Sequence, residues 1–387
     1  MTSSNKRQIT YLNNAATSFP KPAAVVRAVR QAMLLASSSP GRAGYGESLA
    51  EREIFETRQA LAILLGVADP SRLIFTKNAT EALNLALRGA LHPGDHVVTT
   101  SMEHNSVARP LSYLRRRGVS FTRVMCAPDG TLDPAEIERA VQPNTRLIAA
   151  VHASNVCGTI LPVRDLARIA RDRGLLLLVD AAQTAGVIPV NLDQLGADFV
   201  AFSGHKGLLG PQGTGALYVR DPAPLEPLIF GGTGSRSDSP SQPDFPPDKF
   251  ESGTPNVPGL AGLGAGARFV YRKGVANILK REIGMTRILL EGLAELPQAA
   301  VYGPRDVSLR VGVVSLNIGD LDPGQAALRL ENEFGIVTRS GLHCAPWAHE
   351  TIGTLQRGTL RFSLGWATTR ADVARALRAL HEIARTA

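Results

Sequence analysis

The feature that most constrains the fold is an alternation of short apolar runs with helical stretches between residues 72 and 219. A typical run covers residues 175–179, reads Leu-Leu-Leu-Leu-Val, and ends directly at Asp180. Runs rich in leucine and valine that alternate with helices are typical of βαβ units, which build a mostly parallel sheet buried on both faces. Because ligands bind such sheets at the carboxyl ends of the strands, we expect the functional residues there.

The pattern predicts an α/β fold in two parts. The expected strands of the first part are residues 72–76, 96–100, 119–125, 147–152, 175–180, 199–202 and 216–219. One helix is expected to begin near Pro22, and further helices are expected over 48–65, 79–90, 106–117, 134–141 and 163–173. Beyond a Gly, Ser and Pro-rich loop at 230–250, helices are expected over 258–271, 275–296, 323–334 and 369–385, and strands over 311–318, 336–340 and 359–364. We predict a large domain over 20–265 and a smaller α+β domain made of 1–19 and 266–387.

Composition narrows the function classes. The formal charge of +8 permits attraction to anions, but the basic residues are spread out, so nucleic-acid binding is only an alternative. Cys126, Cys157 and Cys344 lie far apart without a CxxC pair, which predicts a reducing compartment and no metal site. The N-terminal residues lack an apolar signal core, and no apolar run approaches the roughly 18 residues that span a bilayer. We therefore expect a cytoplasmic protein without a membrane partner.

Lys206 lies in a Gly-rich turn between the apolar runs 199–202 and 216–219. Burial of an ammonium group is costly unless the group is paired or neutralised. A buried neutral lysine is a nucleophile, and its natural electrophile is a carbonyl or a pyridoxal aldehyde. The alternative is a solvated lysine on a surface turn.

Polar residues follow other expected strands in the same way. Ala79 and Thr80 open a helix, and the free N–H groups of a helix N-terminus suit a phosphate, although a plain N-cap explains them too. His104 can stack on a flat ring or serve as a structural hydrogen-bond partner. Asn155 can donate to a ring oxygen or belong to a turn. Asp180 suits a protonated pyridinium nitrogen, or caps a helix.

Taken together in strand order, these residues predict a pyridoxal phosphate site. The expected cofactor contacts are Ala79, Thr80, His104, Asn155, Asp180, Gln183, Ser203, His205 and Lys206. The prediction of a cofactor site depends on their joint order, since each residue alone has an ordinary structural explanation.

Cys344 marks a second candidate centre. A free cysteine is usually a buried core residue, but Cys344 lies in a polar loop where His343 and Arg339 favour a thiolate. Arg361 lies in an apolar-alternating strand and calls for an anionic partner such as a substrate carboxylate. Arg42, in a loop of small residues, is either solvated or reaches an anion.

From about Tyr11 to its C-terminal helix, the chain resembles the class V aminotransferase-like family, and within it the Suf-type cysteine desulfurases and selenocysteine lyases. The matching segments are 13–17, 103–105, 179–183, 203–206, 251–256 and 339–344. The resemblance implies a PLP-dependent transferase fold of type I and a homodimer in which Thr254 reaches the partner's phosphate. It implies that Lys206 forms the Schiff base and that Cys344 forms a persulfide. The substrate contacts expected with it are Ala15, Arg42, Asn155, Arg339 and Arg361.

The expected reaction converts L-cysteine into L-alanine and leaves a persulfide on Cys344 for a sulfur-acceptor protein. Lys206, Cys344 and His104 are the expected catalytic residues, with His104 assisting proton transfer. Alternatives are a selenocysteine lyase, or an aminotransferase or epimerase of the same class in which Cys344 is incidental. The loop 231–249 and the segment 345–349 depart from the family pattern.

Overall fold

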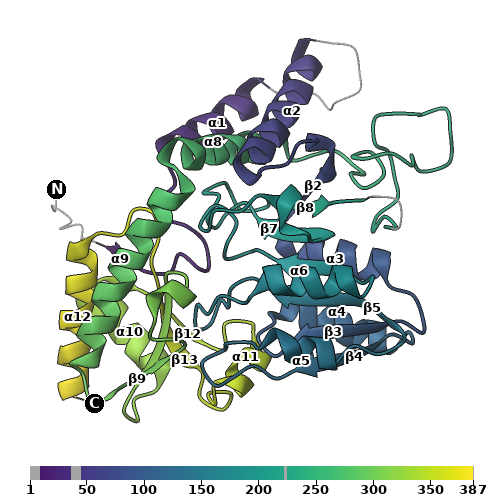
Figure 1. Cartoon of the computed structure of the whole chain (residues 1–387). Helices are drawn as coiled ribbons and strands as arrows, with labels where there is room; N and C mark the ends of the chain where they lie inside the picture. Colours follow the sequence, from purple (N-terminus) through teal and green to yellow (C-terminus); the bar gives the residue numbers. More distant parts are fainter. Residues whose placement is uncertain (1–8, 36–44, 222–224, 387) are drawn as a thin grey trace.

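The fold is built around a seven-stranded sheet in the order β2-β8-β7-β6-β5-β3-β4 (Figure 1). The computed structural model describes residues 9–35, 45–221 and 225–386. The strands of this sheet are β2 (Leu73–Thr76), β3 (His96–Thr100), β4 (Ser120–Val124), β5 (Thr145–Val151), β6 (Leu176–Asp180), β7 (Phe199–Ser203) and β8 (Gly215–Val219). Only β8 runs antiparallel to its neighbours, so the predicted mostly parallel sheet is confirmed.

Helices bury both faces of this sheet. Leu178 packs with α3 (Ala79–Ala90) and α4 (Asn105–Arg115) on one face. The preceding residue, Leu177, packs on the other face with α5 (Pro134–Arg139), α6 (Val163–Asp172) and the short α7 (Leu192–Leu195). Successive side chains of a strand point to opposite faces, which explains why the strands are continuous apolar runs rather than alternating ones.

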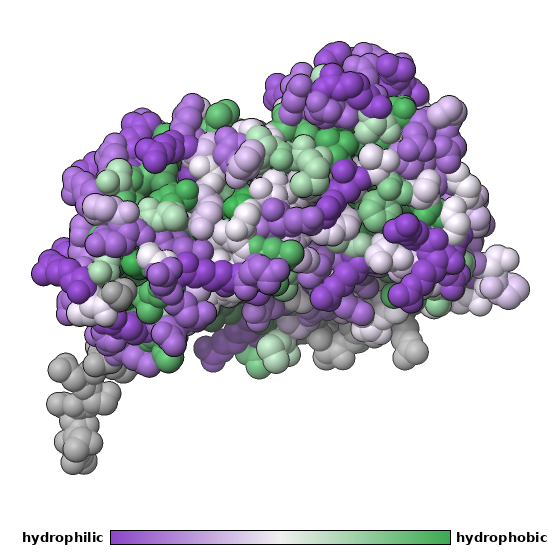
Figure 2. Space-filling view, turned by 90° about the horizontal axis from the view of Figure 1, so that it is seen from below, coloured by the Kyte–Doolittle hydropathy of each residue, from purple (hydrophilic) through white to green (hydrophobic). Residues whose placement is uncertain are grey.

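Three further helices pack against one another beyond the β2 edge of the sheet, as Figure 1 shows. They are α1 (Ala23–Leu35), α2 (Tyr45–Leu65) and α8 (Val257–Lys273). Between β8 and α8 the described part of the loop 230–250 contains no helix or strand, as predicted. The face seen from below interleaves hydrophilic and apolar residues (Figure 2).

The C-terminal part forms a second sheet, antiparallel and four-stranded, in the order β12-β13-β10-β9. Its elements are α9 (Val275–Ala294), β9 (Ala299–Tyr302), β10 (Val313–Ile318), α10 (Pro323–Phe334), β12 (Arg339–Gly341), α11 (Pro346–Thr351), β13 (Thr359–Ser363) and α12 (Arg370–Arg385). Near the N-terminus, β1 (Thr10–Tyr11) pairs in parallel with β11 (Ile336–Val337), which brings the start of the chain beside this second unit. The domain boundaries at residues 20 and 265 stay a prediction, and α8 runs without a break across residue 265.

Most predicted elements occur within a few residues of their expected bounds, and α3, β3 and α10 match them. One prediction is wrong in detail, because the strand expected over 336–340 is divided into β11 and β12. The strand β9 and the helix α11 were not anticipated. Within the described ranges, no helix is long and apolar enough to cross a membrane.

Candidate active site

Lys206 and Asp180 lie at the carboxyl ends of neighbouring strands. Asp180 pairs with Ala201 between β6 and β7, and Lys206 follows the end of β7. The Lys206 amine lies deep in protein, and this burial lowers its pKa to about 8, although the Asp180 charge opposes the shift. Burial raises the pKa of Asp180, while the Ala182 N–H and the Lys206 charge act in the opposite direction. The site thus combines an amine close to neutrality with a buried carboxyl group.

The predicted phosphate-binding residues meet at the N-terminus of α3. The Ala79 N–H donates to Ser203 Oγ at 3.0 Å, which joins the start of α3 to the end of β7. The Thr80 hydroxyl lies 2.7 Å from Ser106 Oγ. Half-buried His205 leaves its buried Nδ1 without a hydrogen-bond partner. An orphaned polar atom beside a helix N-terminus is a ready contact for an anion.

His104 is held as a neutral ring. It caps α4, and its Nδ1 accepts a hydrogen bond from the Ser106 N–H at 3.1 Å, so the ring proton lies on Nε2. Burial, together with the charge of Lys206, lowers the pKa of His104 to about 4. A neutral planar imidazole with its edge fixed is suited to stack on an aromatic cofactor.

Glu103 is a site residue that the sequence reasoning missed. Its Oε1 accepts hydrogen bonds from the Thr100 hydroxyl at 2.6 Å and the Val151 N–H at 2.9 Å, whereas Oε2 has no partner. Burial is the main cause that raises its pKa to about 8, and the charge of Asp180 is a smaller contribution to the same shift. The sequence offers only a weak signal for it, because Ser101 and Met102 separate Glu103 from the end of the buried strand β3.

Arg361 is almost fully buried, and one of its three guanidinium nitrogens has no hydrogen-bond partner. Its Nη1 donates to the Asn155 carbonyl at 2.8 Å and its Nη2 to Asn13 Oδ1 at 3.2 Å, while Nε has no partner. Burial lowers the pKa of Arg361 to about 9. Nearby, the Gln183 side chain donates to the Ala15 carbonyl at 3.2 Å, so the predicted residues Ala15 and Gln183 are in contact.

The Cys344 loop is tied to the same site by backbone hydrogen bonds. The Asn105 N–H donates to the Cys344 carbonyl, and the Asn155 side chain donates to the His343 carbonyl, both at 2.8 Å. Arg339 Nη2 lies 3.7 Å from the Cys344 sulfur, and Cys344 is exposed. His343 and Cys344 have φ values of 49° and 58°, a left-handed conformation that is strained for residues other than glycine and is often found at functional sites.

Among the predicted residues that the structure describes, Thr254 is not part of this cluster. Thr254 is exposed and lines a separate cavity of about 910 Å³ together with Phe75 and Gly213. Arg42 falls in residues 36–44, outside the described residues. Within those described ranges, no group of three or more His, Cys, Asp or Glu side chains could hold a metal ion.

The cluster fits pyridoxal phosphate. The Lys206 amine, with its lowered pKa, suits the aldehyde, and the buried Asp180 carboxyl suits the ring nitrogen. The orphaned His205 Nδ1 and the start of α3 suit the phosphate. Each chemical group of the cofactor therefore has a matching residue on one edge of the sheet.

Comparisons with known proteins agree with this geometry. A probable cysteine desulfurase of Methanothermobacter thermautotrophicus is 38% identical over 387 residues, which cover 98% of this chain and 95% of that relative. A cysteine desulfurase of Dickeya dadantii is 34% identical over 392 residues, which cover 98% of this chain and 93% of that relative. The apo structure of cysteine desulfurase from Thermococcus onnurineus NA1 is similar with a TM-score of 0.92 at 35% identity, covering 98% of this chain and 95% of that one.

The family resemblance and the fold class predicted from the sequence are thereby confirmed. The model of the aminotransferase class-V family matches residues 10–376, almost the whole chain. This protein therefore belongs to the class-V aminotransferase family.

Proposed function

We propose that the protein is a pyridoxal phosphate-dependent cysteine desulfurase that converts L-cysteine into L-alanine and leaves a persulfide on Cys344. One observation carries the proposal: the buried Lys206 amine lies close enough to Arg361 and Cys344 for their charges to act on its pKa. Arg361 is held by the Asn155 carbonyl, and Cys344 lies beside Arg339. The names of the relatives support the proposal. Pyridoxal phosphate, when bound, supplies an electron sink for the bonds around the substrate Cα.

Proton transfer, cofactor binding and carboxylate binding fall to different residues of the chain. Lys206 Nζ, with its pKa near 8, takes and returns the proton at the substrate Cα. Asp180 would hold the ring nitrogen of the cofactor, and His104, whose Nδ1 is fixed by the Ser106 N–H, would stack on the ring and keep its Nε2–H for proton transfer. Arg361 binds the substrate carboxylate through its unpaired Nε and its guanidinium charge.

Cys344 receives the sulfur. Its thiolate attacks the substrate sulfur, so a sulfur–sulfur bond forms and the substrate carbon–sulfur bond breaks. The electron pair of the broken bond remains with the substrate carbon, which takes up a proton and leaves as alanine. Arg339 Nη2 lies 3.7 Å from this sulfur, within reach of a weak hydrogen bond to it. Because Cys344 is exposed, an acceptor protein can collect the sulfur.

The visible spectrum and an alanine assay test the proposal together. The purified protein should show the visible absorption of bound pyridoxal phosphate, and Lys206→Ala should lose it. Cys344→Ala should keep this absorption yet stop the release of alanine from L-cysteine. If Cys344→Ala releases alanine at the wild-type rate, the persulfide role is wrong. Faster turnover of selenocysteine that is independent of Cys344 would instead indicate a selenocysteine lyase.

We also propose a homodimer in a reducing, cytoplasmic compartment. Thr254 is exposed and is not part of the Lys206 cluster. The family resemblance implies that it contacts the cofactor phosphate of the other subunit, and this position supports that role. Three unpaired thiols support a reducing compartment. Sedimentation of the purified protein tests the dimer directly.

A further inference from the structure

The carbonyl oxygen of His205, in the peptide that precedes Lys206, accepts an unusual number of hydrogen bonds. The donors are the Thr17 hydroxyl at 3.2 Å, the Ser18 N–H at 3.0 Å, the Ser18 hydroxyl at 3.0 Å and Lys21 Nζ at 2.8 Å. A carbonyl oxygen has only two lone pairs, so some of these four donors must share a lone pair. The convergence marks this peptide as a point that the fold holds in place.

Lys21 contributes the charged donor of this group. Its Nζ also donates to Ser18 Oγ at 2.8 Å, and the Ser18 hydroxyl in turn donates to the His205 carbonyl. Burial lowers the pKa of Lys21 to about 8. An ammonium group withdrawn from water loses hydration, and a hydrogen bond from a charged donor is stronger than a neutral one. The half-buried Lys21 therefore directs its ammonium group to the His205 peptide.

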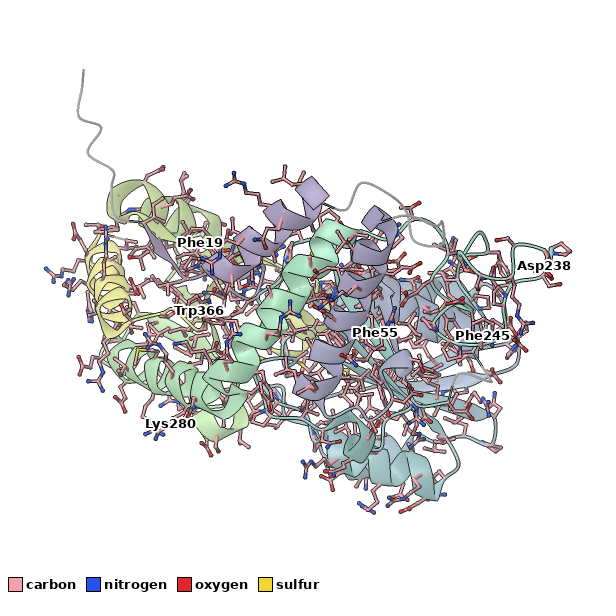
Figure 3. The ribbon with its side chains drawn as sticks, turned by 90° about the horizontal axis from the view of Figure 1, so that it is seen from above. Phe19, Phe55, Asp238, Phe245, Lys280 and Trp366 are labelled. Atoms are coloured by element: carbon pink, nitrogen blue, oxygen red, sulfur yellow. The ribbon has the colours of Figure 1, made fainter. Side chains whose placement is uncertain are left out.

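The segment that carries Lys21 also contacts the other end of the site. We call residues 13–21 the N-terminal strap. At one end of the strap, Asn13 Oδ1 accepts from Arg361. At the other end, the Pro20 carbonyl accepts from Trp366 Nε1 at 3.2 Å. Figure 3 labels Trp366 and Phe19, the residue before Pro20. One short segment thus joins the expected carboxylate-binding arginine to the peptide of the expected cofactor-binding lysine.

We propose that Lys21 is a positioning residue, which fixes the His205–Lys206 peptide so that the Lys206 amine keeps its place in the site. The proposal rests on the proposed role of Lys206. Lys21 acts through the backbone, because the charges that act on the Lys206 amine come from other residues, Asp180 first among them. Loss of the Lys21 contact should therefore displace the amine without neutralising a charge beside it.

The expected effect is on turnover and on cofactor capture. A misplacement of a reacting group by about 1 Å lowers rates by up to roughly 100-fold, so we expect Lys21→Met to lower kcat by roughly 10- to 100-fold. The KM for L-cysteine should change little, since the Asn13–Arg361 contact at the far end of the strap is untouched. Capture of pyridoxal phosphate by the cofactor-free protein should slow by a comparable factor.

The experiment compares three variants with the wild-type protein. Lys21→Met removes the donor but keeps the stem, Lys21→Arg restores a charged donor, and Lys280→Met removes an exposed lysine at the periphery as the matched control (Figure 3). For each, borohydride reduction traps the cofactor on Lys206 at timed intervals after pyridoxal phosphate is added, and mass spectrometry counts the modified peptide. Steady-state kcat and KM and the thermal midpoint are then measured.

We expect slow trapping and low kcat in Lys21→Met, substantial recovery in Lys21→Arg, and wild-type behaviour in Lys280→Met. Wild-type trapping and kcat in Lys21→Met would overturn the positioning role. A loss in Lys21→Met that is matched by an equal rise in KM, or that Lys21→Arg fails to recover, would overturn it too. If the wild-type protein itself traps no cofactor on Lys206, the proposed function fails, and this outcome is distinct from the others.

Discussion

Arg361 offers the sharpest test of substrate recognition. The guanidinium is almost fully buried, Nη1 and Nη2 are engaged by Asn155 and Asn13, and Nε has no partner. Arg361→Lys keeps a positive charge but replaces the planar fork by a compact ammonium group. The substitution therefore removes the geometry that a carboxylate requires while changing the charge of the site little.

The magnitude follows from the hydrogen bonds at stake. A hydrogen bond to a charged group contributes about 1.5–3 kcal/mol. Loss of one such bond to the substrate carboxylate lowers kcat/KM for L-cysteine by roughly 10- to 150-fold, because every 1.4 kcal/mol is about tenfold. Most of this loss should appear as a higher KM, since the carboxylate is bound before and during the reaction.

The assay separates carboxylate binding from general damage to the site. KM for L-cysteine is measured beside the inhibition constant of cysteamine, the analogue that lacks a carboxylate, and Arg305→Lys at an exposed arginine serves as the control. Arg361→Lys should lower kcat/KM for L-cysteine by the stated factor and leave the inhibition constant of cysteamine nearly unchanged. An equal loss of binding for both compounds would refute the reasoning, because the effect would then come from displacement of Asn155 and Asn13.

Three other variants probe the structure. Burial raises the pKa of Glu282 to about 8, so wild-type stability falls as pH rises from the ordinary carboxyl range through about 8. Glu282→Gln stays neutral, and its urea midpoint should exceed that of the wild type increasingly toward pH 9; parallel pH curves would contradict this. Arg310 donates to four backbone carbonyls from a fully buried position, so Arg310→Met should lower the free energy of unfolding by about 1–3 kcal/mol, the cost of a buried acceptor left unpaired, whereas Arg305→Met should have little effect. Asn13→Ala removes an acceptor from Arg361 and should raise KM for L-cysteine with little change in kcat.

Much of the site could be predicted because it obeys a rule of local sequence. A polar residue directly after a buried apolar run must lie at the carboxyl end of a strand, and parallel strands bring those ends together. Asp180 and Lys206 were found in this way, and the register of β6 and β7 places the two strand ends side by side. The start of α3 could also be predicted from the sequence, because Asn78 is a typical N-cap residue and accepts a hydrogen bond from the Glu81 N–H.

The remaining features depend on contacts between distant segments. The convergence of Lys21 on the His205 carbonyl has no signal in the sequence, because its acceptor is a backbone atom and its partners are 184 residues apart. Glu103 looked like one more charged residue until the surrounding strands buried it. The helix α11 is short and begins at Pro346, so its few residues carry no periodic pattern.

The central claim is that Lys206 and Cys344 act in one reaction that removes sulfur from L-cysteine. The most direct test is mass spectrometry of the peptide Ser340–Arg357, which contains Cys344, after brief incubation of the cofactor-loaded protein with L-cysteine. We predict one added sulfur atom on Cys344 in the wild-type protein and none in Lys206→Ala. Sulfur on Cys126 or Cys157 instead, or the same yield in Lys206→Ala, would contradict the account.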